Sequence, residues 1–252
     1  LSAEACYLKG RLAEARGDMS QARSHLKQAL SLRPKYVGAL YAMGRVAQRS
    51  GSPGEAAEYY RNALRIYPQF ADAAYNLGKV LSVQGRLGEA LEAFTQAVAA
   101  DPGMIKARTG MASTLQDLGE SEEARTCIQT AVDLTDDPLV KIRHCLTMPV
   151  ICPSVSAIDE VRRQIEQELD LILSTCPHCE DPFTTLGSTG FYLAYQGRDN
   201  RMLQAKLTAA YRTAAPQLVW TASNVPARRR PNERIRVVIV SRHMRRHTIG
   251  YL

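Results

Sequence analysis

Apolar residues recur along the first half of the chain at helical spacing, in segments that repeat with one fixed period. Four glycines stand 34 residues apart, and so do three prolines: Gly17, Gly51, Gly85 and Gly119, with Pro34, Pro68 and Pro102. Alanine keeps the same step in two more columns, which begin at Ala22 and Ala29. This period predicts pairs of helices, because glycine permits the turn inside each pair and proline closes the second helix.

The helix ends and the helix crossings have their own signals. A column of small residues in the first helix of each pair predicts close helix approach: Gly10, Gly44, Gly78 and Ala112. The segment Ser52-Pro53-Gly54-Glu55 predicts a helix start with Ser52 as the cap, Pro53 at the first position and Glu55 completing a capping box. Asp18 and Gln21 are expected to have the same role in the preceding repeat.

These columns resemble the tetratricopeptide repeat over residues 3–137, with three good repeats and a weaker fourth. In the fourth, Asp136 stands where the proline is due and Pro138 comes two residues late. The resemblance implies an all-α fold, a right-handed tetratricopeptide superhelix. It also implies that an acceptor protein or an extended peptide binds the concave face formed by the first helices.

Tyrosines and cations repeat on that face in the same register. Tyr7, Tyr41 and Tyr75 stand 34 residues apart, as do Arg11, Arg45 and Lys79, and Asn76 is the neighbour of Tyr75. We predict Tyr41, Arg45, Tyr75, Asn76 and Lys79 as substrate-binding residues, because rings and cations offer stacking and hydrogen bonds to a peptide. The alternative is that the tyrosines pack between repeats and the cations are solvated.

The period stops after Pro138, and residues 138–224 read as a helical cap and linker. Amphipathic spacing predicts a short helix at 139–146, a long one at 156–174 that opens at Ser156, and a further pair at 187–197 and 199–218. The CxxC at Cys176 and Cys179 is interpreted as an unmetallated loop, so no metal site is expected. A redox pair and a zinc site completed by Cys152 or Cys145 remain alternatives.

Residues 225–252 change character. A Pro- and Arg-rich linker leads into the β-branched run from Ile235 to Val240, which predicts one terminal β-strand buried in a parallel sheet. This segment carries eight arginines and one acidic residue, which accounts for the whole net charge of +7. Because the other residues sum to zero, the charge does not favour a nucleic-acid-binding face.

The order of the segments resembles the bacterial proteins similar to protein O-linked N-acetylglucosamine transferase and SPINDLY. The repeats are followed by "FYLAYQGRDNRMLQAKL", an Arg-rich linker and "RIRVVIVS…HTIGYL". The resemblance implies that residues 225–252 open a truncated Rossmann-like glycosyltransferase domain, with UDP-N-acetylglucosamine as donor and no further cofactor. It places His247 at the catalytic site and Gly250 in the substrate-binding turn beside it.

Two functions stay open from the sequence alone. One is the N-terminal portion of a protein glycosyltransferase, inactive by itself, whose repeats bind the acceptor. The other is a tetratricopeptide interaction scaffold without transferase activity. Six cysteines without a readable leader favour a reduced, cytoplasmic setting, and no apolar run of membrane-spanning length occurs in the sequence.

Overall fold

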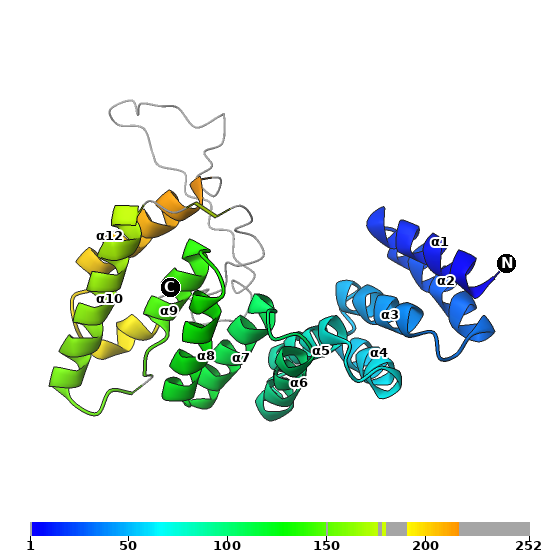
Figure 1. Ribbon diagram of the computed structural model, residues 1–252, viewed down its shortest axis with the longest axis horizontal. Helices are drawn as coiled ribbons and strands as arrows, with labels where there is room; N and C mark the ends of the chain where they lie inside the picture. Colours follow the sequence, from blue (N-terminus) through cyan, green and yellow to red (C-terminus); the bar gives the residue numbers. More distant parts are fainter. Residues whose placement is uncertain (1, 150, 176–177, 180–190, 217–252) are drawn as a thin grey trace, which may run out of the picture. The chain divides into compact units, whose positions relative to one another are not determined.

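The computed structural model describes residues 2–149, 151–175, 178–179 and 191–216, and every regular element among them is helical (Figure 1). The first eight helices are α1 Ala3–Ala15, α2 Met19–Leu32, α3 Val37–Arg49, α4 Pro53–Ile66, α5 Ala71–Val83, α6 Leu87–Ala100, α7 Ile105–Leu118 and α8 Ser121–Asp133. The remaining elements are α9 Pro138–Leu146, α10 Val155–Thr175, the 3-10 helix η1 Phe191–Gln196 and α12 Arg201–Ala214.

Helices α1–α8 form four consecutive pairs, and each pair packs against the next. The turn glycines of the four pairs all adopt positive φ: Gly17 at 83°, Gly51 at 76°, Gly85 at 74° and Gly119 at 88°. A residue with a Cβ would be strained in this conformation. The 34-residue glycine column is therefore confirmed as the turn inside each helix pair.

The small-residue column is confirmed as the point where paired helices touch. A Cβ on Gly78 would lie 2.8 Å from the Phe94 ring, and one on Gly44 would overlap the Tyr60 ring. Tyr60 and Phe94 are fully buried and form the centre of a continuous core that runs along α3–α7. A side chain at either glycine would push the helices of a pair apart.

The two predicted caps had different outcomes. Asp18 accepts a hydrogen bond from the Gln21 backbone amide at 2.9 Å, as expected. Ser52 precedes Pro53 at the start of α4, but its side chain makes no capping hydrogen bond. The predicted capping box is wrong, because the Glu55 carboxylate binds the Arg23 guanidinium of the preceding pair at 2.6 Å.

The helices that follow the repeats share a second core. Leu146, Leu169 and Leu207 are buried together between α9, α10 and α12. The helix at 139–146 is observed as α9, whereas α10 begins before Ser156, since the Ala157 amide donates to the Ser154 hydroxyl at 3.1 Å. Of the expected helix at 187–197, residues 191–196 form η1 and residues 187–190 are not described. The helical cap adjoins the repeats through the contact of α9 with α8.

The C-terminal expectations lie outside the described residues. These are the strand from Ile235 to Val240, the linker before it, and His247 and Gly250. The strand and its domain therefore stay predictions. Among the described helices, none combines the length and the apolarity that crossing a bilayer requires.

Candidate functional site: the first-helix face

The tyrosines and cations singled out by the sequence lie on the first helices of successive pairs. We call this surface the first-helix face and define it by Tyr7, Arg11, Tyr41, Arg45, Tyr75, Asn76 and Lys79. Helix α1 contacts α3, and a hydrogen bond from Asn76 to Tyr41 links α3 with α5. The face is therefore continuous over the first three pairs.

In each of these pairs the cation follows the tyrosine by one helical turn, and its charged group lies over the tyrosine ring. The distances from the charged group to the ring centroid are 5.9 Å for Arg11 on Tyr7, 6.0 Å for Arg45 on Tyr41 and 5.5 Å for Lys79 on Tyr75. Such a contact stabilises by roughly 0.5–1 kcal/mol at a partly exposed site. It also holds the ring and the cation in a fixed relative orientation.

The tyrosines are partly framework. Tyr41 is half-buried and packs against Phe70 and Tyr60, with ring centroids 4.8 Å and 5.9 Å away. Its hydroxyl accepts a hydrogen bond of 3.0 Å from Asn76 Nδ2. Burial raises the pKa of Tyr41, and the same cause raises the pKa of Tyr75. Both tyrosines are therefore partly buried and partly exposed.

A buried carboxylate neutralises the cations at the N-terminal end of the face. Glu14 is 2% exposed, and its oxygens lie 2.7 Å from Arg45 and 3.5 Å from Arg11. Arg49 is 3.9 Å from the carboxylate and also donates to the Glu14 carbonyl at 3.2 Å. The predicted binding residue Arg45 is therefore ion-paired within the chain.

Glu14 was not among the residues predicted from the sequence. Its signal was a lone acidic residue near the end of an amphipathic helix, at a position where the next repeats carry Gln48, Ser82 and Gln116. A residue that occurs once in four repeats is invisible to a search for columns.

Charge is arranged differently at the C-terminal end. The Tyr75 ring has two amino groups close to it, that of Lys79 at 5.5 Å and that of Lys106 at 5.0 Å from the centroid. Lys106 is paired with Asp72 at 2.7 Å. Lys79 is exposed, and none of the ion pairs among the described residues includes it.

Arg143 of α9 joins this end of the face. Its guanidinium donates to the Ser113 hydroxyl of α7 at 2.9 Å, and it lies close enough to Tyr75 to lower the pKa of that tyrosine against the larger effect of burial. Burial also lowers the pKa of Arg143 itself, partly offset by Tyr211 and Tyr75. Position 143 continues the column of Tyr7, Tyr41, Tyr75 and Thr109 by one further step of 34, a signal that sequence reasoning missed.

A second polar cluster is structural. His144 lies 3.1 Å from Glu168, which also binds Arg125 at 3.0 Å, so α8, α9 and α10 are tied together. Cys145 beside it donates to the Lys141 carbonyl at 3.1 Å. Burial raises the pKa of the Cys145 thiol, which opposes formation of the reactive thiolate.

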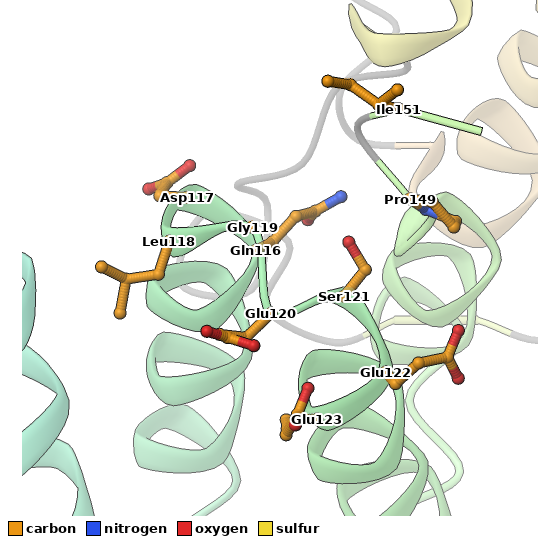
Figure 2. Close-up of a pocket in the computed structure, with 10 residues that line it drawn as sticks. All are labelled: Gln116, Asp117, Leu118, Gly119, Glu120, Ser121, Glu122, Glu123, Pro149 and Ile151. Carbon is orange, nitrogen blue, oxygen red and sulfur yellow. The ribbon is translucent and has the colours of Figure 1, made fainter. Parts of the chain in front are cut away.

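A hollow lies near the turn between α7 and α8 (Figure 2), and none of the predicted binding residues lines it. Its lining is Gln116, Asp117, Leu118, Gly119, Glu120, Ser121, Glu122, Glu123, Pro149 and Ile151. Figure 2 shows the carboxylates of Glu120 and Glu122 on different sides of the turn. The described residues contain no group of three or more ligating side chains that could hold a metal ion. Cys179 of the CxxC is buried, and its partner Cys176 lies outside the described residues.

Comparison with protein families identifies the repeats. Two models described as tetratricopeptide repeat match, one at residues 7–67 and 41–105 and the other at residues 83–142. Together they span residues 7–142, more than half of the chain. No curated protein matches the chain.

Solved structures show the same fold at low sequence identity. MamA from Desulfovibrio magneticus RS-1 is 20% identical, with a TM-score of 0.59 over 68% of this chain and 96% of that one. YrrB, described as a TPR protein with an unusual peptide-binding site, is 22% identical, with a TM-score of 0.55 over 66% of this chain and 81% of that one. These likenesses establish an all-helical tetratricopeptide superhelix.

An O-GlcNAc transferase of Thermobaculum terrenum is also similar. It is 24% identical, with a TM-score of 0.49, and the match covers 54% of this chain but 27% of the transferase. At this TM-score the similarity carries no argument about activity.

Proposed function

Because the protein belongs to the tetratricopeptide repeat family, we propose that it binds an extended peptide or the helix of a partner protein on the first-helix face. One observation carries this proposal: tyrosine rings with a cation above each recur at a fixed step on that face, and Tyr41 and Tyr75 are partly exposed. Aromatic rings supply contact area at low conformational-entropy cost, and cations supply hydrogen bonds to carbonyl oxygens.

The similar structures support a binding role. YrrB is described as a TPR protein with an unusual peptide-binding site, and its match covers 66% of this chain. Peptide recognition by this family needs no cofactor, and the residues that define the face include no nucleophile activated by a base. We therefore propose a protein-interaction module rather than a catalytic one for residues 7–142.

The test begins with a synthetic library of random 12-residue peptides that have free C-terminal carboxylates. Peptides retained by the protein are labelled, and their Kd is measured by fluorescence anisotropy. Tyr75→Ala is expected to weaken binding about tenfold, since a buried aromatic anchor contributes roughly 1–2 kcal/mol or more. Tyr67→Ala is the matched control, because Tyr67 is exposed at the end of α4 and off the face. Equal losses in both variants, or no retained peptide, would refute the proposal.

We also propose that the bound peptide is the acceptor of a protein glycosyltransferase. The supporting observation is the order of the sequence segments, in which "FYLAYQGRDNRMLQAKL" forms η1, the loop after it and the first half of α12, after the repeats. His247 is proposed near the acceptor hydroxyl and Gly250 in the adjoining turn, with UDP-N-acetylglucosamine as donor.

The glycosyltransferase proposal is tested on the full gene product with the peptides selected above. Transfer of N-acetylglucosamine to a bound peptide, reduced by His247→Ala, is the expected result. Residues 1–252 alone are expected to give no transfer, because the resemblance assigns only the opening of a glycosyltransferase domain to residues 225–252. If the full gene product binds peptides but has no transferase sequence, the peptide-binding proposal stands and the glycosyltransferase proposal is refuted.

A further inference from the structure

We propose that the outer side of the first helix pair binds a second copy of this chain, at the hollow between its α7 and α8. The first of these two surfaces, the basic surface, consists of Leu8, Lys9, Leu12, Arg16 and His25. The second, the acidic hollow, is the one shown in Figure 2. Neither includes a residue that defines the first-helix face, so the contact is distinct from peptide binding.

The apolar part of the basic surface is exposed where the later pairs are buried. Leu12 is 52% exposed, whereas Val46 and Val80, one and two repeat steps further on, are at most 2% exposed. These valines lie on first helices that pack against the second helix of the preceding pair. Leu8, one turn before Leu12, is 64% exposed. On α1 this face therefore has no covering helix among the described residues.

The charge beside these leucines is specific to the first pair. A hollow next to Leu12 is lined by Lys9, Ala13, Arg16, Asp18, Gln21 and His25. In the other three pairs the equivalents of Lys9, Arg16 and His25 are all uncharged side chains. Gln21 stands where those three pairs share a glutamate. The first pair thus has extra basic residues and one acid fewer at positions where the fold requires neither.

The cations of the basic surface have no counter-charge within the described chain. Lys9 and Arg16 take part in no ion pair or side-chain hydrogen bond there. Asp18 is the one acidic residue in the lining. Its Oδ1 accepts hydrogen bonds from the Gln21 amide at 2.9 Å and the Ser20 hydroxyl at 3.1 Å, so this carboxylate caps α2.

A surface that only solvates the end of a superhelix has a different composition. Terminal repeats that serve solubility have a polar outer face, and soluble surfaces mix charges of both signs. The basic surface instead keeps Leu8 and Leu12 exposed and adds charge of one sign. Exposed leucines beside unpaired cations are typical of a surface that an acidic and partly apolar partner covers.

The acidic hollow has these complementary properties. Four carboxylates and no cation line it: Asp117, Glu120, Glu122 and Glu123 (Figure 2). None of the four side chains has an ion-pair or hydrogen-bond partner in the described part of the chain. By contrast, Glu55, the equivalent of Glu123, is bound to Arg23 of the preceding pair at 2.6 Å. Leu118 and Ile151 of the same lining are 42% and 85% exposed.

The basic surface and the acidic hollow are expected to meet between copies. The pairs α3–α4 and α5–α6 stack between the first pair and the fourth, which keeps the two surfaces of one chain apart. A contact between two unlike surfaces is heterologous, so it extends into a ring or an open chain of copies. The mean mass should therefore rise with protein concentration and fall with added salt, which screens exposed charges.

Sedimentation velocity at several protein concentrations tests the contact with two charge-reversed variants. The basic-surface variant is Lys9→Glu with Arg16→Glu, and the acidic-hollow variant is Asp117→Lys with Glu120→Lys. Each is expected to raise the Kd of self-association at least about tenfold, because like charges then lie opposite each other. Circular dichroism establishes that both variants fold.

The matched control is Arg65→Glu with Glu92→Lys. Both residues are exposed on α4 and α6 and have no ion pair or side-chain hydrogen bond in the described structure. This variant reverses one charge of each sign outside the two surfaces, so it is expected to associate as the parent does.

Two further samples show whether the surfaces bind each other. An equimolar mixture of the two charge-reversed variants is expected to form heterodimers, because the intact basic surface of one meets the intact acidic hollow of the other. A variant with all four substitutions is expected to regain association, since opposite charges face each other again. Restored association in both samples supports the proposal.

The contrary results are equally definite. A parent that stays monomeric at every concentration, a charge-reversed variant that associates like the parent, or a mixture that stays monomeric would overturn the proposal. The Kd for the retained peptides is measured on the same variants and is expected to be unchanged. Failure of self-association with intact peptide binding would leave the proposed function standing, so the two failures are distinguishable.

Discussion

Arg45 and Arg143 are both half-buried arginines on the first-helix face, but their surroundings are opposite. At the N-terminal end, the buried Glu14 lies within 3.9 Å of three guanidinium groups, and the tyrosine hydroxyl in the repeat of Arg45 is hydrogen-bonded to Asn76. At the C-terminal end, Arg143 bonds to the neutral hydroxyl of Ser113, and Lys79 has a tyrosine ring as its neighbour.

This difference separates framework from receptor on a surface built of the same residue types. A cation whose charge is met inside the chain holds neighbouring pairs together and is a poor ligand for a partner. A cation that is partly desolvated and has no counter-charge is stabilised when a partner supplies an opposite charge. The periodic pattern alone does not distinguish these two cases.

The largest expected effect is a loss of stability at the N-terminal end of the face. Tyr41→Ala removes contacts with Phe70 and Tyr60 and the bond to Asn76, so it is expected to lower the free energy of unfolding by about 3 kcal/mol. Tyr75→Ala loses the contact with Phe94 and is expected to cost less, about 2 kcal/mol. Urea unfolding measures both, and an equal or reversed order would contradict the comparison.

A smaller loss of stability is expected from Glu14→Gln, which removes the carboxylate and leaves three arginines near one another. We expect about 2 kcal/mol, less than for a fully buried pair because the arginines are partly exposed. Glu92→Gln is the control, since Glu92 is exposed on α6 without an ion pair in the described structure. The same Glu14→Gln variant should gain affinity for acidic peptides, and a variant as stable as the parent would show that Glu14 does not hold this end together.

Much of the fold was predictable because it is periodic. The glycine column predicted the turns at Gly51 and its equivalents, and the small residues at Gly44 and Gly78 predicted the helix crossings. The capping box at Ser52 failed because the carboxylate of Glu55 had a better partner, the guanidinium of Arg23, brought close only by folding.

A third, alkaline test addresses the C-terminal end. Burial raises the pKa of Tyr211 to about 12, so the folded state holds a proton that the unfolded state releases near pH 10. The contribution of the protonated Tyr211 to the free energy of unfolding is therefore fully present below about pH 10, and it is lost as the pH rises toward about 12.

The Tyr211→Phe variant has no phenol to ionise at this position. Over that pH range its free energy of unfolding should therefore fall by roughly 1–2 kcal/mol less than that of the parent. Urea midpoints at several pH values measure the difference, and Tyr67→Phe at the exposed end of α4 serves as the control. Identical slopes for Tyr211→Phe and the parent would contradict the buried environment assigned to this ring beside Arg143.

The smallest expected effect concerns Lys79. Because this amino group is exposed, Lys79→Met should weaken an acidic peptide only about twofold to threefold, as expected for an exposed charge pair. Raising the salt concentration should remove most of the Lys79 contribution and less of the Arg143 contribution, since half-buried groups are screened less. Anisotropy titrations at two salt concentrations measure both, and equal salt sensitivity would place the two cations in the same environment.

The candidate site was only partly predictable. The tyrosine and cation columns identified the face, but two residues that determine its electrostatics were not found from those columns. Glu14 occurs once and has no periodic signal, and Arg143 follows the break at Asp136, where the proline column ends. The ion pairs of Glu14 required knowledge of which helices pack together, which a single sequence does not supply. Arg143, in contrast, keeps the 34-residue step of Tyr75 and Thr109, so extending that column past the break would have found it.

The central claim is that the face has an end at Arg45 where the charge is neutralised by Glu14, and an end at Arg143 where no ion pair among the described residues neutralises the charge. The most direct test is NMR of the arginine Nε–Hε groups during titration with the tightest of the retained 12-residue peptides. The account predicts saturable shifts of the Arg143 signal and an unchanged Arg45 signal. Shifts at Arg45 with Arg143 unaffected would contradict it.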